Sequence, residues 1–183
     1  MSLHPSDLQK CNYFNKLSDK TIEFLAEKFR EKTYPKGAVV LKEGDEATAF
    51  YFVKKGRLEV TKNTKHGAAK LSTISSCQGF GEIALLTNSL RTASVRAITD
   101  VTLLELSKAD FETVMETEHA FKNVLMKRAA DIARYDKIKT LQPFALLEPD
   151  RMYALMARMT EQTFGLGQDI IVQREKGDDY YVI

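Results

Sequence analysis

Two residues of opposite charge, Glu82 and Arg91, stand nine positions apart in the run FGEIALLTNSLRTASV, which covers residues 80–95. Gly81 precedes the carboxylate, and a glycine lets backbone amides approach a ligand closely. The apolar residues 83–86 predict a short helix, whose first N–H groups and positive dipole end attract an anion. Arginine adds a planar set of charged donors, whereas a carboxylate accepts hydrogen bonds from hydroxyl groups. These residue types in this order predict a site for a small phosphate that carries a hydroxyl.

The composition argues against several other functions. The chain has 183 residues and a net charge of +2, which is too small to indicate a nucleic acid or an anionic membrane as partner. No apolar run approaches the roughly 20 residues needed to span a bilayer, and the N-terminus lacks the apolar core of a secretion signal. The three histidines have no metal-ligand spacing, and no nucleophile–base pair or triphosphate loop is visible. We therefore expect a cytoplasmic protein with no membrane segment, no metal and no catalytic residue.

The two cysteines, Cys11 and Cys77, form no CxxC pair. A chain of this kind in a reducing compartment is expected to keep its thiols free. We interpret Cys77 as structural or incidental.

Hydrophobic periodicity divides the chain into a helix, a series of strands and two further helices. Ser18 and Asp19 begin the first helix, which should end near Lys32. Short β-type runs follow at residues 39–41, 50–53, 58–60, 71–74, 95–97 and 101–106, with an exposed hairpin loop at 63–69. Ser107 caps the next helix, and another covers residues 118–139. This order predicts an α+β fold, with a small antiparallel β-roll, jelly-roll-like, flanked by N- and C-terminal helices.

The chain also repeats itself. A shift of 130 residues aligns residues 14–53 with residues 144–183 without a gap, and seven of the 40 pairs are identical. The turn glycines Gly37 and Gly167 are one such pair. The shared pattern indicates a duplicated unit. Because the second copy ends inside an apparent strand, we expect a fragment of a longer protein, with one domain at residues 8–138 and a truncated second copy at 139–183.

The motifs in this order resemble the cyclic nucleotide-binding domain family. FGEIALL and RTASV match the ligand-binding cassette of that family, and EGD at residues 43–45 and FYFVKKG at 50–56 fit upstream. The tandem arrangement is similar to kinase A regulatory subunits and cyclic GMP-dependent kinases, and the cassette is similar to that of hyperpolarisation-activated channels. The resemblance implies a regulatory module that binds cAMP or cGMP, needs no cofactor, and controls a kinase or another effector domain. It also implies that the second copy, which lacks a cassette in this chain, binds no nucleotide.

The resemblance assigns a role to each residue of the cassette. Glu82 would accept a hydrogen bond from the ribose 2′-hydroxyl, and Arg91 would pair with the cyclic phosphate. Gly81 and Ala84 would bring the backbone close to the sugar and phosphate. The hydroxyl of Thr92 would reach the phosphate or the base, without deciding between cAMP and cGMP. The ligand-binding residues implied in this way are Gly81, Glu82, Ile83, Ala84, Arg91, Thr92 and Ala93.

Several alternatives stay open at this point. The same fold with a silent pocket would be a non-binding interaction domain. Leu90 stands where the family often has proline, which would leave Arg91 slightly less preorganised. Tyr135 either caps the base or packs in a core. Lys127 and Arg128 weakly resemble a kinase pseudosubstrate, but within a helix they are interpreted as a solvated basic face.

Overall fold

The computed structural model describes residues 4–64, 67–141, 144–171 and 181. The chain divides into two compact units, Met1–Arg134 and Tyr135–Ile183. Within the described residues, no helix is both long and apolar enough to cross a bilayer. The strand expected at residues 180–183 lies outside the described residues except for Tyr181.

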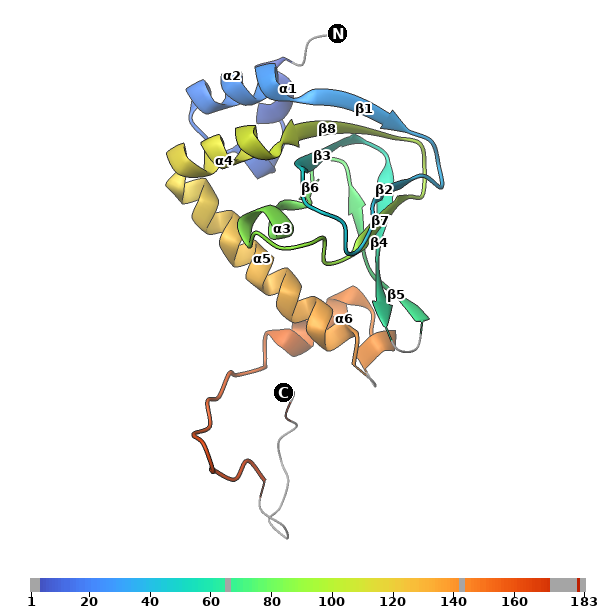
Figure 1. The fold of residues 1–183 in the computed structure, drawn as a ribbon, viewed down its shortest axis with the longest axis vertical. Helices are drawn as coiled ribbons and strands as arrows, with labels where there is room; N and C mark the ends of the chain where they lie inside the picture. Colours follow the sequence, from blue (N-terminus) through green and yellow to red (C-terminus); the bar gives the residue numbers. More distant parts are fainter. Residues whose placement is uncertain (1–3, 65–66, 142–143, 172–180, 182–183) are drawn as a thin grey trace. The chain divides into compact units, whose positions relative to one another are not determined.

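Three helical elements open the first unit (Figure 1): α1 (Pro5–Gln9), η1 (Asn12–Phe14) and α2 (Asp19–Lys28). The hydroxyl of Ser18 caps α2 by accepting a hydrogen bond from the Thr21 amide at 3.3 Å, as the sequence predicts. The predicted helix end near Lys32 is wrong. The helix ends at Lys28 because the chain from Arg30 onward pairs with a strand far along the sequence.

Eight strands follow: β1 (Arg30–Tyr34), β2 (Val39–Leu41), β3 (Ala49–Lys55), β4 (Arg57–Thr64), β5 (Gly67–Ser75), β6 (Gly79–Phe80), β7 (Ser94–Ala97) and β8 (Val101–Ser107). They form two four-stranded sheets, ordered β1-β8-β3-β6 and β2-β7-β4-β5, in which every pair of neighbours is antiparallel. The predicted antiparallel roll with flanking helices is therefore confirmed.

The β4–β5 hairpin is longer than the sequence predicts. The two strands pair from Arg57 with Ser75 up to Thr64 with Gly67, so most of the expected loop at residues 63–69 is strand. Lys70 and Glu59 form a cross-strand ion pair at 3.0 Å. The side chains of these strand ends are polar, so a hydrophobic pattern does not predict the strands. Backbone hydrogen bonds between the two strands, rather than burial, stabilise them.

Strand β3 separates two hydrophobic clusters of the first unit. Ala49, Tyr51 and Val53 belong to the cluster inside the roll, with partners such as Leu58, Ala97 and Leu103. Phe50 and Phe52 belong to the cluster that the helices cover, with partners such as Phe14, Ile22 and Phe111. Successive side chains of a strand point to opposite faces, so an unbroken apolar run fits a strand buried on both sides.

Three helices complete the first unit and lead out of it: α3 (Glu82–Leu86), α4 (Lys108–Thr117) and α5 (His119–Lys139). Ser107 caps α4 by accepting a hydrogen bond from the Asp110 amide at 3.2 Å, as predicted. Glu118 leaves the helical conformation, with φ −109° and ψ 69°, and separates α4 from α5.

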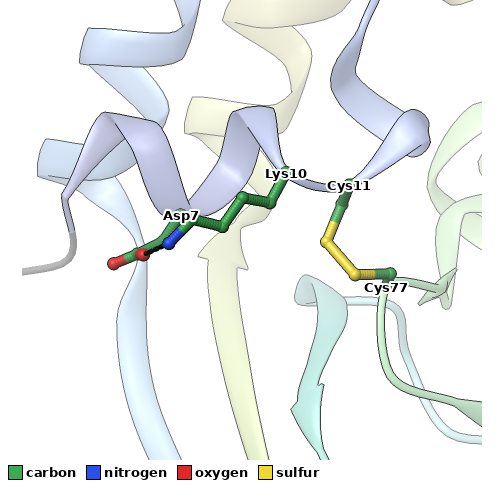
Figure 2. Close-up of a disulfide and its surroundings, with 4 residues drawn as sticks. All are labelled: Asp7, Lys10, Cys11 and Cys77. Atoms are coloured by element: carbon green, nitrogen blue, oxygen red, sulfur yellow. Dashed lines mark hydrogen bonds and ion pairs between the residues drawn. A yellow bond between two sulfur atoms is a disulfide. The ribbon is translucent and has the colours of Figure 1, made fainter.

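A disulfide joins Cys11 to Cys77, so the expectation of free thiols is wrong (Figure 2). The two residues are 66 positions apart in the sequence, and their Cα atoms are 5.3 Å apart. Cys11 lies at the start of η1, and Cys77 lies in the turn between β5 and β6. Spacing along the chain cannot reveal this pairing, because the fold alone brings the two segments together.

The second unit contains η2 (Phe144–Leu146) and α6 (Pro149–Met156). Its core is built from Tyr135, Ile138 and Met152. The ring of Tyr135 lies 5.2 Å from that of Tyr153. Of the two roles that the sequence leaves open for Tyr135, the structure shows the packing role.

Local geometry recurs in the two units at the 130-residue shift found in the sequence. Five backbone hydrogen bonds have counterparts in numbering: 11 to 8 and 141 to 138, 14 to 11 and 144 to 141, 17 to 14 and 147 to 144, 22 to 18 and 152 to 148, 38 to 35 and 168 to 165. Gly37 and Gly167 both have positive φ, at 90° and 81°. The sequence repeat therefore corresponds to the same chain path through the helical lead-in and the first turn.

Candidate functional site

Gly81 connects β6 to α3 and fixes the direction in which the helix begins. Its φ is +84°, in the left-handed region that side chains disfavour. A Cβ at this position would lie 2.9 Å from Nη1 of Arg91. Both the backbone conformation and the neighbouring guanidinium therefore require glycine here.

The side chain of Arg91 is buried, with 4% of its surface exposed. Nη1 donates a hydrogen bond to the Gly81 carbonyl at 2.8 Å, and Nη2 donates one to the Ala49 carbonyl at 2.7 Å. Nε is buried as well, and it has no hydrogen-bond partner within the described residues. Burial lowers the pKa of the guanidinium, an effect opposed by Tyr51, Glu82 and Asp45. A cationic group is thus held in place while its Nε–H has no partner in the described residues.

The EGD motif fixes the main chain of Arg91. The Arg91 amide donates a hydrogen bond to the Asp45 carbonyl at 2.8 Å, and the Gly44 amide donates one to the Arg91 carbonyl at 2.9 Å. Glu43 binds the same region, since its amide donates to Oγ of Ser94 at 3.0 Å. The arginine is therefore positioned through its backbone by a turn nearly fifty residues earlier in the sequence.

Glu82 is the first residue of α3, and only 2% of its surface is exposed. Burial raises the pKa of its carboxyl. The backbone N–H of Glu82 opposes this effect, followed by the positive charges of Arg128 and Arg91. An ionisable group buried in this way is costly for the fold unless a partner is supplied, and such groups concentrate at functional sites.

Arg128 and Tyr13 are site residues that the sequence does not indicate. The guanidinium of Arg128, on α5, lies 5.2 Å from the centre of the Tyr13 ring. Arg128 is half-buried, so the interpretation of this residue as part of a solvated basic face is wrong. Burial, and then the charge of Glu82, raise the pKa of the Tyr13 hydroxyl. The available signal is spacing, because Arg128 follows the apolar residues Phe121 and Leu125 by seven and three positions, which places it on their face of α5.

The structure places the predicted residues in two groups. Gly81, Glu82 and Arg91 lie together, and Ala84 is buried in the same short helix. Ile83 and Ala93 are half-buried, and Thr92 is exposed. These three flank the charged pair in the chain, and their roles toward a ligand stay predictions.

The loop that contains Leu90 is held without a proline. The Ser89 amide donates to the Ala84 carbonyl at 3.0 Å, and the Thr87 hydroxyl donates to the Ile83 carbonyl at 2.8 Å. Leu90 itself is 56% exposed. Side-chain and backbone bonds thus restrain this loop where a proline ring would otherwise do so.

The arrangement suits recognition of an anion that also carries hydroxyl groups. Arg91 provides a buried charged donor, and α3 begins beside it with N–H groups that have no partner inside the helix. Glu82 provides a hydrogen-bond acceptor close enough to Arg91 for the arginine charge to lower the pKa of its carboxyl. No group of acidic, histidine and cysteine side chains able to hold a metal ion occurs in the described part of the chain.

Comparison with known proteins identifies the family. Residues 31–118 match the model of the cyclic nucleotide-binding domain. This segment is a cyclic nucleotide-binding domain. It is a regulatory rather than a catalytic domain, and the matched residues run from β1 through α4, with Glu82 and Arg91 inside.

Curated relatives of this cyclic nucleotide-binding domain include cGMP-dependent kinases and a kinase regulatory subunit. A cGMP-dependent protein kinase of Drosophila melanogaster is 30% identical over 150 residues, which are 82% of this chain and 13% of the kinase. The chain spans between 13% and 36% of the length of six such curated relatives.

Solved structures share its fold. The regulatory domain of Toxoplasma gondii kinase A with cAMP has a TM-score of 0.66 and 22% identity, over 71% of this chain and 49% of that one. A regulatory subunit of a cAMP-independent kinase A from Trypanosoma cruzi, bound to guanosine, has a TM-score of 0.67 and 22% identity. That match covers 80% of this chain and 51% of the other.

Proposed function

We propose that the domain at residues 8–138 binds a cyclic nucleotide, either cAMP or cGMP, as a regulatory ligand. Arg91 pairs with the cyclic phosphate, and Glu82 accepts the ribose 2′-hydroxyl. Backbone groups of Gly81, Ile83 and Ala84 surround the sugar and phosphate. Thr92 and Ala93, which directly precede β7, complete the contacts. The module uses no cofactor beyond this ligand.

The single observation that supports this proposal most strongly is the unused Nε of Arg91. The two terminal nitrogens donate to carbonyls, so the guanidinium is held rigidly while Nε, although buried, has no partner in the described residues. A buried charged donor without an acceptor is destabilising. A phosphate oxygen would satisfy it with a charge-assisted hydrogen bond, which is stronger than a neutral one.

The same reasoning extends to the rest of the protein. The matching geometry at the 130-residue shift supports a second, partial domain at residues 139–183. The kinase relatives support a role in controlling a kinase or other effector, in the cytoplasm. The second partial domain contributes no cassette and binds no nucleotide by itself.

Calorimetry with the whole chain tests the ligand assignment. The ligands are cAMP, cGMP, adenosine and guanosine, because the two nucleosides lack the phosphate. We expect the cyclic nucleotides to bind more tightly than the nucleosides. Arg91→Lys keeps the charge but loses the fork geometry, and we expect it to weaken cyclic nucleotide binding by about 1.5–3 kcal/mol while nucleoside binding changes little.

Arg96→Lys is the matched control. Arg96 is an exposed arginine five residues after Arg91, on β7, and its Nη1 donates to the Gly37 carbonyl at 2.8 Å. Its replacement should leave all four affinities unchanged. If Arg91→Lys loses the same binding free energy for cyclic nucleotides and for nucleosides, the proposed contact between Arg91 and the phosphate is contradicted. Absence of binding to all four compounds by the folded wild type would favour the alternative, an interaction domain with a silent pocket.

A further inference from the structure

The disulfide joins two segments that meet beside the nucleotide site. Cys77 precedes β6, and β6 leads directly through Gly81 to Glu82, five residues after Cys77. The turn that carries Cys77 is fixed to β3, because the Cys77 amide donates to the Val53 carbonyl at 2.9 Å. A covalent bond at Cys77 therefore acts on a restrained turn that is continuous with the site.

On the other side of the bond, Cys11 stands two residues before Tyr13. A Cβ at Gly79 would lie 2.6 Å from the Tyr13 hydroxyl oxygen, so this tyrosine packs directly on the backbone of β6. The Tyr13 ring also carries the guanidinium of Arg128, whose charge acts on Glu82. The disulfide thus holds the N-terminal segment, residues 4–17, where Tyr13 packs on β6 and carries Arg128, the residue whose charge acts on Glu82.

The two sulfur-bearing residues differ in access to solvent. Cys77 is exposed, whereas Cys11 is buried, with 6% of its surface exposed (Figure 2 shows the bond between the two segments). Thiol–disulfide exchange depends on access to the sulfur that is attacked. In a reducing compartment, a disulfide is typically transient and redox-sensing rather than a permanent brace. The pair has the asymmetry expected of an entry thiol and a resolving thiol.

We propose that Cys77 and Cys11 form a reversible thiol–disulfide exchange site that clamps the N-terminal segment onto β6 and tightens nucleotide binding. The oxidant is a low-molecular-weight disulfide such as glutathione disulfide. The Cys77 thiolate attacks one of its sulfurs and releases one thiolate, leaving a mixed disulfide. The Cys11 thiolate then attacks the Cys77 sulfur and releases the second. Two protein thiols and one small disulfide give one protein disulfide and two small thiols, and the two thiol protons pass to the released thiolates.

The effect on affinity follows from the number of conformations that remain. The crosslink removes states in which Tyr13 leaves Gly79 and Arg128 loses its place over the ring. A ligand binds more weakly when only a fraction of the protein is competent to bind it, so a larger competent fraction raises the apparent affinity. This part of the inference rests on the proposed nucleotide function.

The experiment compares the full chain after incubation with glutathione disulfide and after a phosphine reductant. Alkylation and mass spectrometry identify the state of both cysteines. Hydrogen exchange of residues 11–14 and 79–86, measured without nucleotide, reports the clamp. Calorimetry with cAMP and cGMP reports the affinity. We expect slower exchange in both segments of the oxidised chain and binding tighter by about fivefold or more.

The Cys11→Ser/Cys77→Ser double variant is the control, and it should behave like the reduced chain under both conditions. The inference fails if glutathione disulfide does not produce the Cys11–Cys77 bond, or leaves a stable mixed disulfide at Cys77. It also fails if the bond forms and neither exchange nor affinity changes. Slower exchange without nucleotide binding in either state would support the clamp and contradict the proposed function, so the two failures are distinguishable.

Discussion

Glu82 and Arg91 are the only charged residues in the run at 80–95, and both are buried. The structure shows no hydrogen-bonded ion pair between them. Arg91 donates hydrogen bonds to two backbone carbonyls. The charge of Arg128 lowers the pKa of Glu82 more than the charge of Arg91 does. Buried charges without a direct partner lower the free energy of unfolding, and such groups are found where a ligand supplies the partner. The unliganded site is therefore expected to be less stable than a neutral version of it.

Replacement of Glu82 by glutamine tests this expectation. The pKa of Glu82 is raised above its ordinary value of 4.5, so its favourable, protonated form is fully present below pH 4.5 and lost as pH rises through the raised pKa. At neutral pH we expect Glu82→Gln to unfold with a free energy equal to or higher than the wild type. Its cyclic nucleotide affinity should fall by about 1 kcal/mol, because a charge-assisted hydrogen bond becomes neutral.

Denaturant unfolding between pH 4 and 8 and calorimetry at pH 7 make the two measurements. Glu23→Gln, on the exposed face of α2, is the control for removing one carboxylate. A Glu82→Gln variant that is destabilised at pH 7 but binds normally would contradict both halves of the prediction.

At the scale of elements, Glu118 connects three helices of the first unit. It lies between α4 and α5 and accepts hydrogen bonds from the hydroxyls of Ser18, at 2.5 Å, and Thr21. Both donors belong to the N-terminal turn of α2, where a helix favours negative charge. These bonds lower the pKa of the carboxyl. Glu118 therefore fixes the point where α4 ends against the start of α2.

We expect Glu118→Gln to lower the free energy of unfolding by about 0.5–1 kcal/mol at pH 7, a small value because the group is partly solvated. Since the pKa is lowered, the contribution is present above pH 4.5 and is lost as pH falls through the lowered pKa. Urea unfolding at pH 7 and pH 3 measures it. Glu116→Gln, an exposed neighbour on α4, is the control, and an equal loss at both pH values would exclude the ionic contact.

The elements themselves were predicted unevenly. Apolar alternation located the buried strands, and the serine caps located the starts of α2 and α4. The end of α2 and the length of the β4–β5 hairpin were missed. The end of α2 is set by pairing of β1 with β8, about seventy residues away, which propensity in a local window does not contain. The hairpin is extended by backbone pairing between polar strands, which a hydrophobic pattern does not reveal.

At the scale of the whole molecule, the two units share a lead-in in which Ile22 and Met152 occupy equivalent positions. Ile22 is 2% exposed in the core of the first unit, and Met152 is 0% exposed in the core of the second. Equivalent buried positions in separate cores allow a matched pair of substitutions.

We expect Ile22→Ala and Met152→Ala each to cost about 2–5 kcal/mol in the unit that contains the residue. Hydrogen exchange should speed up in the first unit for Ile22→Ala, and only in residues 135–156 for Met152→Ala. Exchange measured by mass spectrometry on both variants makes the comparison. Faster exchange throughout the chain in Met152→Ala would show that the two units unfold together.

The sequence by itself determined the fold class and the charged cassette, because alternation, caps and the run at residues 80–95 are local signals. It also determined the repeat, because duplicated chains keep their turn glycines and apolar positions. Only the tertiary structure decided how Arg91 is held, that Arg128 lies over the Tyr13 ring and acts on Glu82, and that Cys11 joins Cys77. These are contacts between segments far apart in the chain, and the packing of the whole first unit sets them rather than any local spacing.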